Sequence, residues 1–353
     1  MRSTDRSTDR FTGRSTRRVL AAAALVVTLA AVAEADVLRV PADHPTIQEA
    51  VDASQDGDTI EIGPGRWQEP VTIAGRSTLI LRGRGRAVLD GDGVFEPLRI
   101  VGSSRIVVEN LRIENSGGHG VQITDSGEIT VQRCRIRGTV LDGISVADCG
   151  EVRIERNTLQ DVGNDGVRLS HSGEPVADLQ VVTRNRLRNI GDDGVWVGGP
   201  VNALIERNVI RVALDDGIDV AADAAGCRVI ANRITVAGDE GIEIGAEGCE
   251  IAGNRVARIE GDGIDCDSGD NQIVRNRVTR TGDDGIDIDG GTGNLVDANV
   301  VQKAGASGIH LTSGSNSVIN NVVRGSGAFD LHDASGSGTN SYDRNRFRTE
   351  QID

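Results

Sequence analysis

One short unit recurs along most of the chain at nearly constant spacing, and it constrains the fold more than any other feature. The unit is a glycine followed by two apolar residues with one other residue between them, as in Gly120-Val121-Gln122-Ile123. Successive glycines lie 23, 23, 28, 23, 24, 22, 22 and 23 positions apart. Alternation with period two indicates β-strands, whereas a helical repeat would show a period near 3.6. The repeating glycines are Gly120, Gly143, Gly166, Gly194, Gly217, Gly241, Gly263, Gly285 and Gly308.

A second ladder runs in phase with the first. Asparagines recur at matching intervals, at positions 157, 185, 208, 232, 254, 276, 299, 321 and 345, and a shorter series lies five positions before the later members, at 271, 294, 316 and 340. A period near 22 predicts a coil of several short strands, so the fold class is all-β, a parallel β-solenoid of about ten coils. Stacked asparagines are expected to hydrogen-bond along the ladder, and we interpret the glycines as corners that need permissive dihedral angles.

The two ends of the repeat region have the composition of caps. We expect an N-terminal cap over residues 37–62, with a short amphipathic helix over 45–51, and coils over 63–348. Phe329, Tyr342 and Phe347 are expected to close the other end. The single step of 28 residues places an insertion near 171–177, and such insertions often border a binding surface.

Residues 1–35 have the pattern of a signal peptide. Arg14, Arg17 and Arg18 precede an apolar run that ends at Ala33-Glu34-Ala35, a small-x-small cleavage site. The pair Arg17-Arg18 leaves both a general and a twin-arginine export route open. We therefore expect an exported protein, periplasmic or extracellular, whose one domain spans residues 36–353 and contains no membrane span.

Charge excludes some partners of that domain. The whole chain carries a net charge of −15; without residues 1–35 it holds 32 basic and 50 acidic residues, a net charge of −18. This balance argues against nucleic acid and anionic membranes as partners. It is compatible with cations, glycans or basic proteins, while the oligomeric state stays open.

Several segments resemble a known superfamily. Thr46 to Val51, Gly57 to Ile62 and Pro64 to Trp67 are similar to the N-terminal cap of pectin-lyase-like proteins. The later coils resemble the repeat of its carbohydrate-binding and sugar-hydrolase group, which includes the NosD-like periplasmic proteins. Over residues 37–348 this resemblance implies a single-stranded right-handed parallel β-helix with a short capping helix. It is weak for activity, because the superfamily contains lyases, hydrolases, esterases, epimerases and non-enzymes.

The catalytic signatures of that superfamily are incomplete in this chain. The motifs of pectin methylesterases and of alginate-type epimerases are absent. Asn164-Asp165-Gly166 followed by Asp192-Asp193-Gly194 is similar to the first polygalacturonase motifs, but no Gly-His-Gly or Arg-Ile-Lys follows. We interpret the partial match mainly as repetition of the corner.

Carboxylates gather at the glycine corner. One set immediately precedes the glycine, and for Asp193, Asp216, Asp262 and Asp284 we favour Asx-turn hydrogen bonds to corner amides. A second set is expected to point outward as a stripe that binds Ca²⁺, because Ca²⁺ takes about six to eight oxygen ligands; solvation alone is the alternative. The candidate Ca²⁺ ligands are Asp215, Asp219, Asp239, Glu243, Asp265, Asp283 and Asp287.

The same corner contains the candidate catalytic residues. Closely spaced carboxylates can share a proton and so provide the acid and base that glycosidases need. We choose Asp193, Asp216 and Asp219 for these roles. Trp196 and Arg168 lie in the neighbouring outward positions and are candidates for substrate binding, since an exposed indole can stack on a sugar.

Arginines and cysteines form two further patterns. Arg156, Arg184, Arg207 and Arg275 precede ladder asparagines, and Arg186, Arg233, Arg255 and Arg277 follow them. This basic face could bind an acidic glycan, although solvation is the simpler interpretation. Cys227 and Cys249 occupy equivalent positions one coil apart, within disulfide range, while Cys134 and Cys266 fit as buried thiols. No zinc or copper motif is present.

Two hypotheses of different class remain. The first is an exported β-helix that interacts with carbohydrate and acts as a polysaccharide hydrolase or lyase at the acidic corner. The second is a non-catalytic surface or scaffold β-helix that binds Ca²⁺.

Overall fold

The computed structural model describes residues 35–174, 178–336 and 338–353. The expected signal peptide lies outside this set except for Ala35, as do residues 175–177 of the expected insertion. No helix in the described part of the chain is long and apolar enough to cross a membrane.

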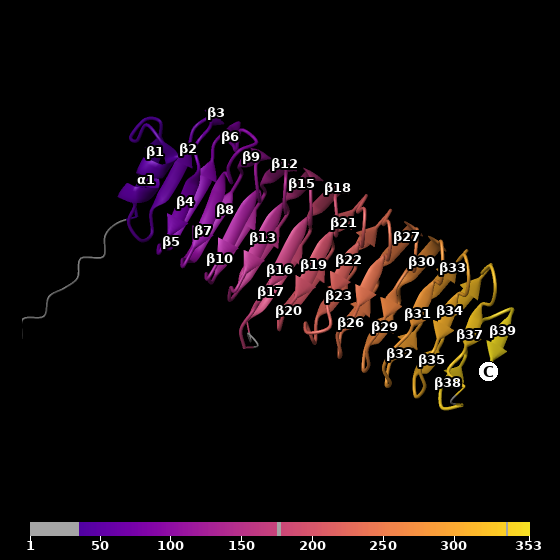
Figure 1. Ribbon diagram of the computed structural model, residues 1–353. Coiled ribbons are helices and arrows are strands. Elements are labelled where there is room, and N and C mark those ends of the chain that lie inside the picture. The colour runs from indigo at the N-terminus through magenta and orange to yellow at the C-terminus, as the bar shows by residue number, and fades with distance from the viewer. Residues whose placement is uncertain (1–34, 175–177, 337) are drawn as a thin grey trace, which may run out of the picture. The chain divides into compact units, whose positions relative to one another are not determined.

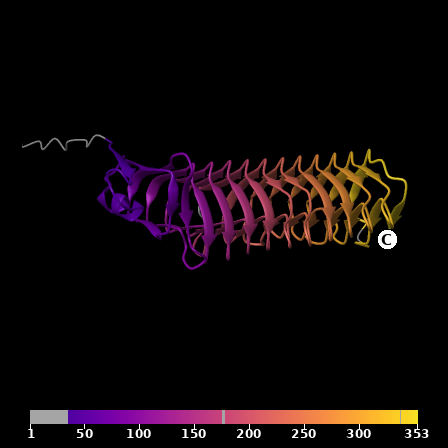
Figure 2. The same cartoon turned by 90° about the horizontal axis from the view of Figure 1, so that it is seen from above.

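The described strands form a parallel β-solenoid with three faces (Figures 1 and 2). A complete coil contributes one strand to each face in turn, and strands of successive coils pair in parallel within each sheet. The only helix among the described residues is α1 (Ile47–Ala53) at the N-terminal end. The predicted fold is thereby confirmed.

The first face, sheet A, has 14 strands, which is more than the ten coils expected. The earliest coils lack the glycine and asparagine ladders, so a number of coils taken from those ladders is too low. Sheet A comprises β1 (Val37–Val40), β2 (Thr59–Ile62), β5 (Ser77–Gly83), β8 (Ser104–Glu109), β11 (Ile129–Gln132), β14 (Val152–Glu155), β17 (Leu179–Thr183), β20 (Asn202–Glu206), β23 (Arg228–Ile230), β26 (Glu250–Ala252), β29 (Gln272–Val274), β32 (Leu295–Asp297), β35 (Ser317–Ile319) and β38 (Ser341–Asp343).

The second face, sheet B, follows sheet A in every coil after a tight corner. It comprises β3 (Gly65–Trp67), β6 (Ala87–Asp90), β9 (Arg112–Ser116), β12 (Arg135–Thr139), β15 (Thr158–Val162), β18 (Arg186–Ile190), β21 (Val209–Ile210), β24 (Arg233–Ile234), β27 (Arg255–Ile259), β30 (Arg277–Thr281), β33 (Val300–Gln302) and β36 (Val322–Arg324).

The third face consists of sheet C and its continuation, sheet D, which an isolated bridge between Ile264 and Ile286 joins. Sheet C comprises β4 (Val71–Ala74), β7 (Leu98–Val101), β10 (Val121–Thr124), β13 (Ile144–Ala147), β16 (Val167–Ser170), β19 (Val195–Gly198), β22 (Ile218–Val220), β25 (Ile242–Ile244) and β28 (Asp265–Cys266). Sheet D comprises β31 (Ile286–Ile288), β34 (Ile309–Leu311), β37 (Leu331–Asp333) and β39 (Glu350–Ile352).

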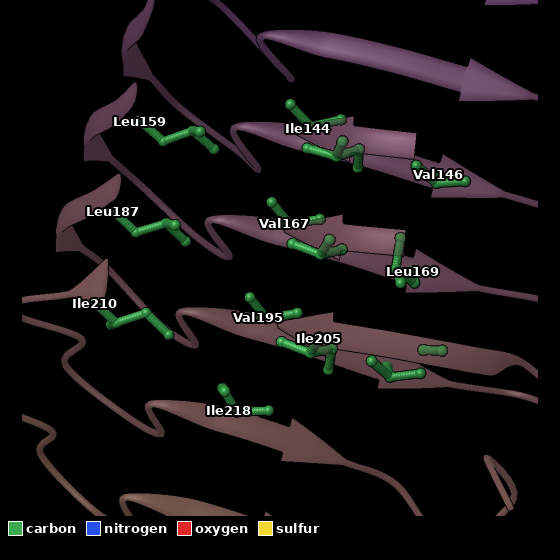
Figure 3. Close-up of a cluster of buried hydrophobic side chains, with 14 of the residues drawn as sticks. Ile144, Val146, Leu159, Val167, Leu169, Leu187, Val195, Ile205, Ile210 and Ile218 are labelled. Atoms are coloured by element: carbon green, nitrogen blue, oxygen red, sulfur yellow. The ribbon is translucent and has the colours of Figure 1, made fainter. Parts of the chain in front are cut away.

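The core consists of aliphatic columns that run along the solenoid (Figure 3). Ile144, Val167, Val195 and Ile218 follow one another in register on sheet C and are fully buried. Their spacing is set by the strand spacing of about 4.8 Å, so that each side chain packs against its own equivalent. Branched aliphatic residues tolerate this packing, and the core needs few aromatic residues as a result.

The asparagine ladder forms at the corner between sheets A and B, as predicted. The Asn232 side chain accepts a hydrogen bond from the backbone N–H of Asn208 at 2.9 Å and donates one to the Ile205 carbonyl at 2.8 Å. Asn254 repeats the pattern one coil later. The shorter series is confirmed as well, since Asn294 accepts from the N–H of Asn271 at 2.9 Å. These carboxamides satisfy buried corner groups that water cannot reach.

The repeated glycines have a different purpose from the one expected. Gly217 has no positive φ; instead, a Cβ at this position would lie 2.4 Å from the Gly241 carbonyl oxygen and 2.6 Å from Cγ2 of Ile234. Close approach between coils therefore requires the glycine. The left-handed conformation occurs at the residue before the ladder asparagine, and an arginine commonly occupies it: Arg156, Arg184, Arg207 and Arg275 each have φ near 56°.

The caps agree with prediction in outline. Helix α1 begins at Ile47, two residues later than expected, because the Thr46 side chain caps it by accepting from the N–H of Glu49 at 3.2 Å. Residues 37–40 and 59–62 pair as strands of sheet A, so the cap is itself part of the solenoid. At the C-terminal end Tyr342 and Phe347 pack against the core, whereas Phe329 contacts His332.

The five cysteines are buried free thiols. Cys227 and Cys249 are adjacent, as their spacing predicted, and their side chains are hydrogen-bonded to one another without a disulfide. Burial raises the pKa of Cys134 to about 12, so this thiol remains protonated and unreactive.

The asparagine ladder leads to a stability prediction. Asn232→Ala leaves a buried N–H and a buried carbonyl without partners, and should lower the free energy of unfolding by about 2–5 kcal/mol. Urea denaturation followed by circular dichroism measures this, with the outward-facing Asn202→Ala on β20 as control. Equal stabilities of the two variants would show that the ladder contributes nothing.

Candidate functional site

One column of outward side chains on sheets C and D contains most of the candidate residues. The strand register places Arg168 beside Trp196, Trp196 beside Asp219, Asp219 beside Glu243, and Glu243 beside Asp265. The bridge between Ile264 and Ile286 continues the column to Asp287, and strand pairing extends it to His310 and His332. We call Asp219, Glu243, Asp265 and Asp287 the acidic column. Its members are partly exposed, and strand spacing sets their Cα atoms about 4.8 Å apart.

A second set of carboxylates immediately precedes the glycine in each coil, and we call it the corner column: Asp165, Asp193, Asp216, Glu240, Asp262 and Asp284. One carboxylate oxygen of Asp193 accepts from the backbone N–H of Asp216 at 2.9 Å, and Asp216 likewise accepts from Glu240 at 2.7 Å. The expected bonds to corner amides are therefore present, but they reach the next coil and are not Asx turns within one corner. Stacking in register brings that amide into reach.

Asp193 and Asp216, two of the three candidate catalytic residues, are only 6% and 5% exposed, and each has an oxygen bound to the backbone. Asp219, the third candidate, is partly exposed and remains accessible.

Asp216, Glu240 and Glu243 form a compact group in which ligand atoms lie within 4.8 Å of one another. Burial, together with a hydrogen bond to the Glu243 side chain, raises the pKa of Asp216. The raised pKa favours the protonated form of the buried Asp216 at neutral pH, with the Glu240 and Glu243 side chains beside it. Glu243, a candidate Ca²⁺ ligand from the sequence, therefore joins the acidic column to the carboxylates that precede the glycine.

Other members of both columns also have raised pKa values. Burial is the largest cause for each, and the charge of neighbouring carboxylates adds to it. The pKa rises to about 7 at Asp219, where Glu243 is the main neighbour, and to about 8 at Asp193 and Asp265. One oxygen of Asp265 is buried without a hydrogen-bond partner. The acidic column and the corner column therefore hold protonated and ionised carboxyl groups side by side near neutral pH.

Trp196 lies at the N-terminal end of the acidic column. The Arg168 guanidinium lies 3.6 Å from the centre of its ring and donates to Asp165 at 2.9 Å. A Cβ at Gly198 would come within 1.9 Å of the indole, so glycine provides the space for the ring. Because Arg168 covers one ring face, a sugar can stack only on what remains exposed. The indole N–H also faces Asp219 and partly offsets its raised pKa.

His310 lies at the opposite end of the column and is not among the candidates expected from the sequence. Its Nδ1 is 3.2 Å from Asp284 and 3.1 Å from Asp287, and its ring stacks on His332 at 4.9 Å. The neighbouring carboxylates of Asp284 and Asp287 raise the pKa of His310 to about 10. Its place in the glycine repeat, equivalent to that of Asp287, was the signal that could have identified it.

The seven expected Ca²⁺ ligands do not form one stripe. Asp215, Asp239 and Asp283 lie outside the corner column, whereas Asp219, Glu243, Asp265 and Asp287 form the acidic column on its other side. Among the described residues, clusters with ligand atoms within 4.8 Å include Asp262 with Asp265 and Asp287, and Asp192 with Asp193 and Asp215. Asp219 and Asp239 belong to none of the clusters found there. The candidate ligands are divided into two sets because the row of buried corner carboxylates lies between them.

Comparison with known proteins identifies the fold. A family model described as the right handed beta helix region matches residues 92–181 and 176–325. No curated protein matches the chain in sequence.

Several solved structures share the architecture at low sequence identity. The catalytic unit of a thermostable GH87 α-1,3-glucanase from Streptomyces thermodiastaticus is 19% identical, with a TM-score of 0.58 over 87% of this chain and 66% of that one. The A-module of the mannuronan C-5 epimerase AlgE4 from Azotobacter vinelandii is 14% identical, with a TM-score of 0.55 over 88% and 96%. The surface adhesin PfbA of Streptococcus pneumoniae is 12% identical, with a TM-score of 0.62 over 82% and 88%. At these identities the likeness establishes the fold alone.

The raised pKa values predict how stability depends on pH. Asp193 and Asp265 have a folded-state pKa of about 8, against about 4 in an unfolded chain. A raised pKa gives a stability contribution that is complete below about pH 4 and is lost as the pH rises through about 8. The melting temperature should therefore fall between about pH 5 and about pH 9.

Asp193→Asn tests this explanation, because its amide oxygen can still accept from the Asp216 N–H. We expect a higher melting temperature than the parent at alkaline pH and a shallower decline, measured by differential scanning fluorimetry. The exposed Asp223→Asn makes the same charge change away from both columns. An identical decline in all three proteins would contradict the assignment.

Proposed function

The chain belongs to the right-handed β-helix proteins, and on this premise we propose that it binds a polysaccharide at the acidic column and hydrolyses it there. The observation that carries the proposal is the in-register pair Asp219 and Glu243, one coil apart on β22 and β25. Glycoside hydrolysis requires one protonated and one ionised carboxyl group on either side of the scissile bond. Pectin-lyase-like proteins, which the cap resembles, include polysaccharide-active enzymes.

The two residues have different proposed roles. Burial raises the pKa of Asp219 to about 7, which suits a general acid that donates its proton to the glycosidic oxygen. Glu243 accepts a hydrogen bond from protonated Asp216 and acts as the carboxylate that attacks the anomeric carbon. Water then cleaves the glycosyl–enzyme bond, with Asp219 as base. Adjacent strands place the Cα atoms of the two residues about 4.8 Å apart, so that their carboxyl groups can approach the separation of about 5 Å that retaining enzymes use.

The neighbouring residues support these roles without reacting. Asp216 positions Glu243 and supplies its hydrogen bond, while Asp193 fixes the corner by binding the Asp216 amide. Arg168 and Trp196 bind the sugar on the N-terminal side of the bond. There the guanidinium offers hydrogen-bond donors and the indole offers an apolar edge.

A panel of neutral and acidic polysaccharides, with release of reducing ends as the readout, tests the activity. Asp219→Asn and Glu243→Gln should each lower turnover by about 100-fold or more. Glu247→Gln, exposed and outside both columns, should retain parent activity. Folding of each variant is checked by circular dichroism.

Two results would contradict the proposal. If no polysaccharide is bound or cleaved by folded protein, the chain is not a carbohydrate-active enzyme. If the released products carry a new double bond that absorbs in the ultraviolet, the reaction is elimination, and a lyase replaces the hydrolase.

A non-catalytic surface or scaffold β-helix is the second candidate function. The hydrogen-bonded corner column favours it, because those bonds stabilise coil stacking and need no substrate. In that case the cluster of Asp262, Asp265 and Asp287 is expected to bind Ca²⁺. Excess Ca²⁺ should then raise the melting temperature of the parent but not of Asp265→Asn, and EDTA should reverse the effect. An unchanged melting temperature would remove Ca²⁺ from this candidate.

Export is also proposed, to the periplasm or the extracellular space, on the signal-peptide pattern of residues 1–35.

A further inference from the structure

Sheet B presents a row of arginines to solvent. Strand pairing places Arg233 beside Arg255 and Arg255 beside Arg277, on β24, β27 and β30. Earlier coils add Arg186 and Arg188 on β18, with Arg211 directly after β21. We call this surface the arginine face: Arg135, Arg137, Arg186, Arg188, Arg211, Arg233, Arg255, Arg258, Arg277 and Arg280, all exposed.

These arginines lack acidic partners within the described part of the chain. None of them has a nitrogen within 4.0 Å of a carboxylate oxygen there, although the protein as a whole carries a net charge of −15. Two make neutral contacts instead, Arg277 with the Gln302 side chain at 3.1 Å and Arg258 with the Thr235 carbonyl at 3.5 Å. By contrast the corner arginines Arg156 and Arg207 each contact a neighbouring glutamate.

The arginine face is also hollowed along its length. One depression of about 670 Å³ is lined by Arg186, Arg188, Arg211, Arg233 and Arg258. The next, of about 450 Å³, adds Arg255 and Arg277 and shares Arg233, Thr235 and Arg258 with the first. The two therefore adjoin, and they form a shallow trough over several coils. Its floor is a hydrogen-bonded sheet, which sets the Cα atoms of arginines in successive coils about 4.8 Å apart.

We propose that the arginine face binds a linear acidic polysaccharide, with guanidinium groups paired to the carboxylate or sulfate groups of successive sugars. Guanidinium and carboxylate form two parallel hydrogen bonds, so a row of arginines recognises a row of such anions. Thr235 and Thr279, which also line the trough, provide hydroxyl groups for uncharged sugar positions. A straight trough with a regular repeat fits a linear polymer.

Nucleic acid fits this surface less well. Single strands are held by bases stacked on aromatic side chains, and no aromatic residue lines either depression. A duplex would extend beyond the trough toward a protein that is negative overall, which weakens non-specific binding. The proposed hydrolytic site lies on a different sheet, so this binding does not depend on it.

Binding of polygalacturonate to the full chain tests the proposal, with its fully methyl-esterified form as the uncharged comparison. We expect affinity for polygalacturonate alone, weakened by added salt. The double variant Arg233→Gln/Arg255→Gln should bind about tenfold more weakly or worse. The matched control Arg39→Gln/Arg228→Gln removes two exposed charges from sheet A and should bind as the parent does. Glu247→Gln, which removes an exposed carboxylate outside both columns, should also bind normally.

Four outcomes would overturn the proposal. These are no binding of polygalacturonate, equal binding of the esterified form, equal losses in the two double variants, and binding of oligo(dT) as tight as that of polygalacturonate. A further contrary outcome is self-association of the parent, seen by analytical ultracentrifugation, that Arg233→Gln/Arg255→Gln abolishes while no glycan binds. That result would assign the arginine face to contact with a second copy's acidic column.

Discussion

Every side chain in this solenoid lies beside its own equivalent one coil away, about 4.8 Å along the axis. Each column must therefore consist of side chains that can pack against, or bond to, copies of themselves. The stability of the structure depends on how each column meets this requirement. Asparagine solves the problem fully, because its carboxamide accepts a hydrogen bond from the preceding coil and donates one to the following coil, as Asn232 does between Asn208 and Asn254. Branched aliphatic residues solve it by packing, and glycine by leaving no Cβ between neighbouring backbones.

Ionised side chains repel their equivalents in the neighbouring coils, so they cannot stack as asparagine does. Both candidate surfaces lie where columns of charged side chains occur. At the corner, each aspartate accepts a hydrogen bond from a backbone N–H of the following coil, as Asp193 does from Asp216, but an ionised carboxylate has no N–H with which to donate in return. Burial raises the pKa of several of these aspartates and so favours their protonated form. Proton donors such as Asp216 therefore lie next to carboxylates such as Glu243. On sheet B the arginines remain exposed and charged, and they lack anions within the described chain.

The two surfaces share one scaffold but differ in what they can recognise. The acidic column combines neutral and ionised carboxyl groups with Trp196 at one end and His310 at the other, a composition suited to acid–base chemistry. No carboxyl group and no aromatic residue lines the trough of the arginine face, so it suits retention of an anionic polymer. The polysaccharide bound at the acidic column and the acidic polysaccharide bound at the arginine face would both run along the axis of the solenoid. The solved relatives share the architecture only, and at 12–19% identity they do not choose between these activities.

The sequence by itself determined the architecture, because in a solenoid the period along the chain becomes the stack along the axis. The ladders at Asn157 to Asn345 and the outward position of Asp219 followed from periodicity alone. Only the tertiary structure decided which groups meet across coils: that Asp193 binds the next coil's amide, that Arg168 covers Trp196, and that His310 bridges two aspartates. It also showed that glycine is needed for close approach, while arginine takes the left-handed corner. Periodicity gives the position of a side chain but not its rotamer, its burial or the charge beside it, and those properties are set by neighbouring coils more than twenty residues away.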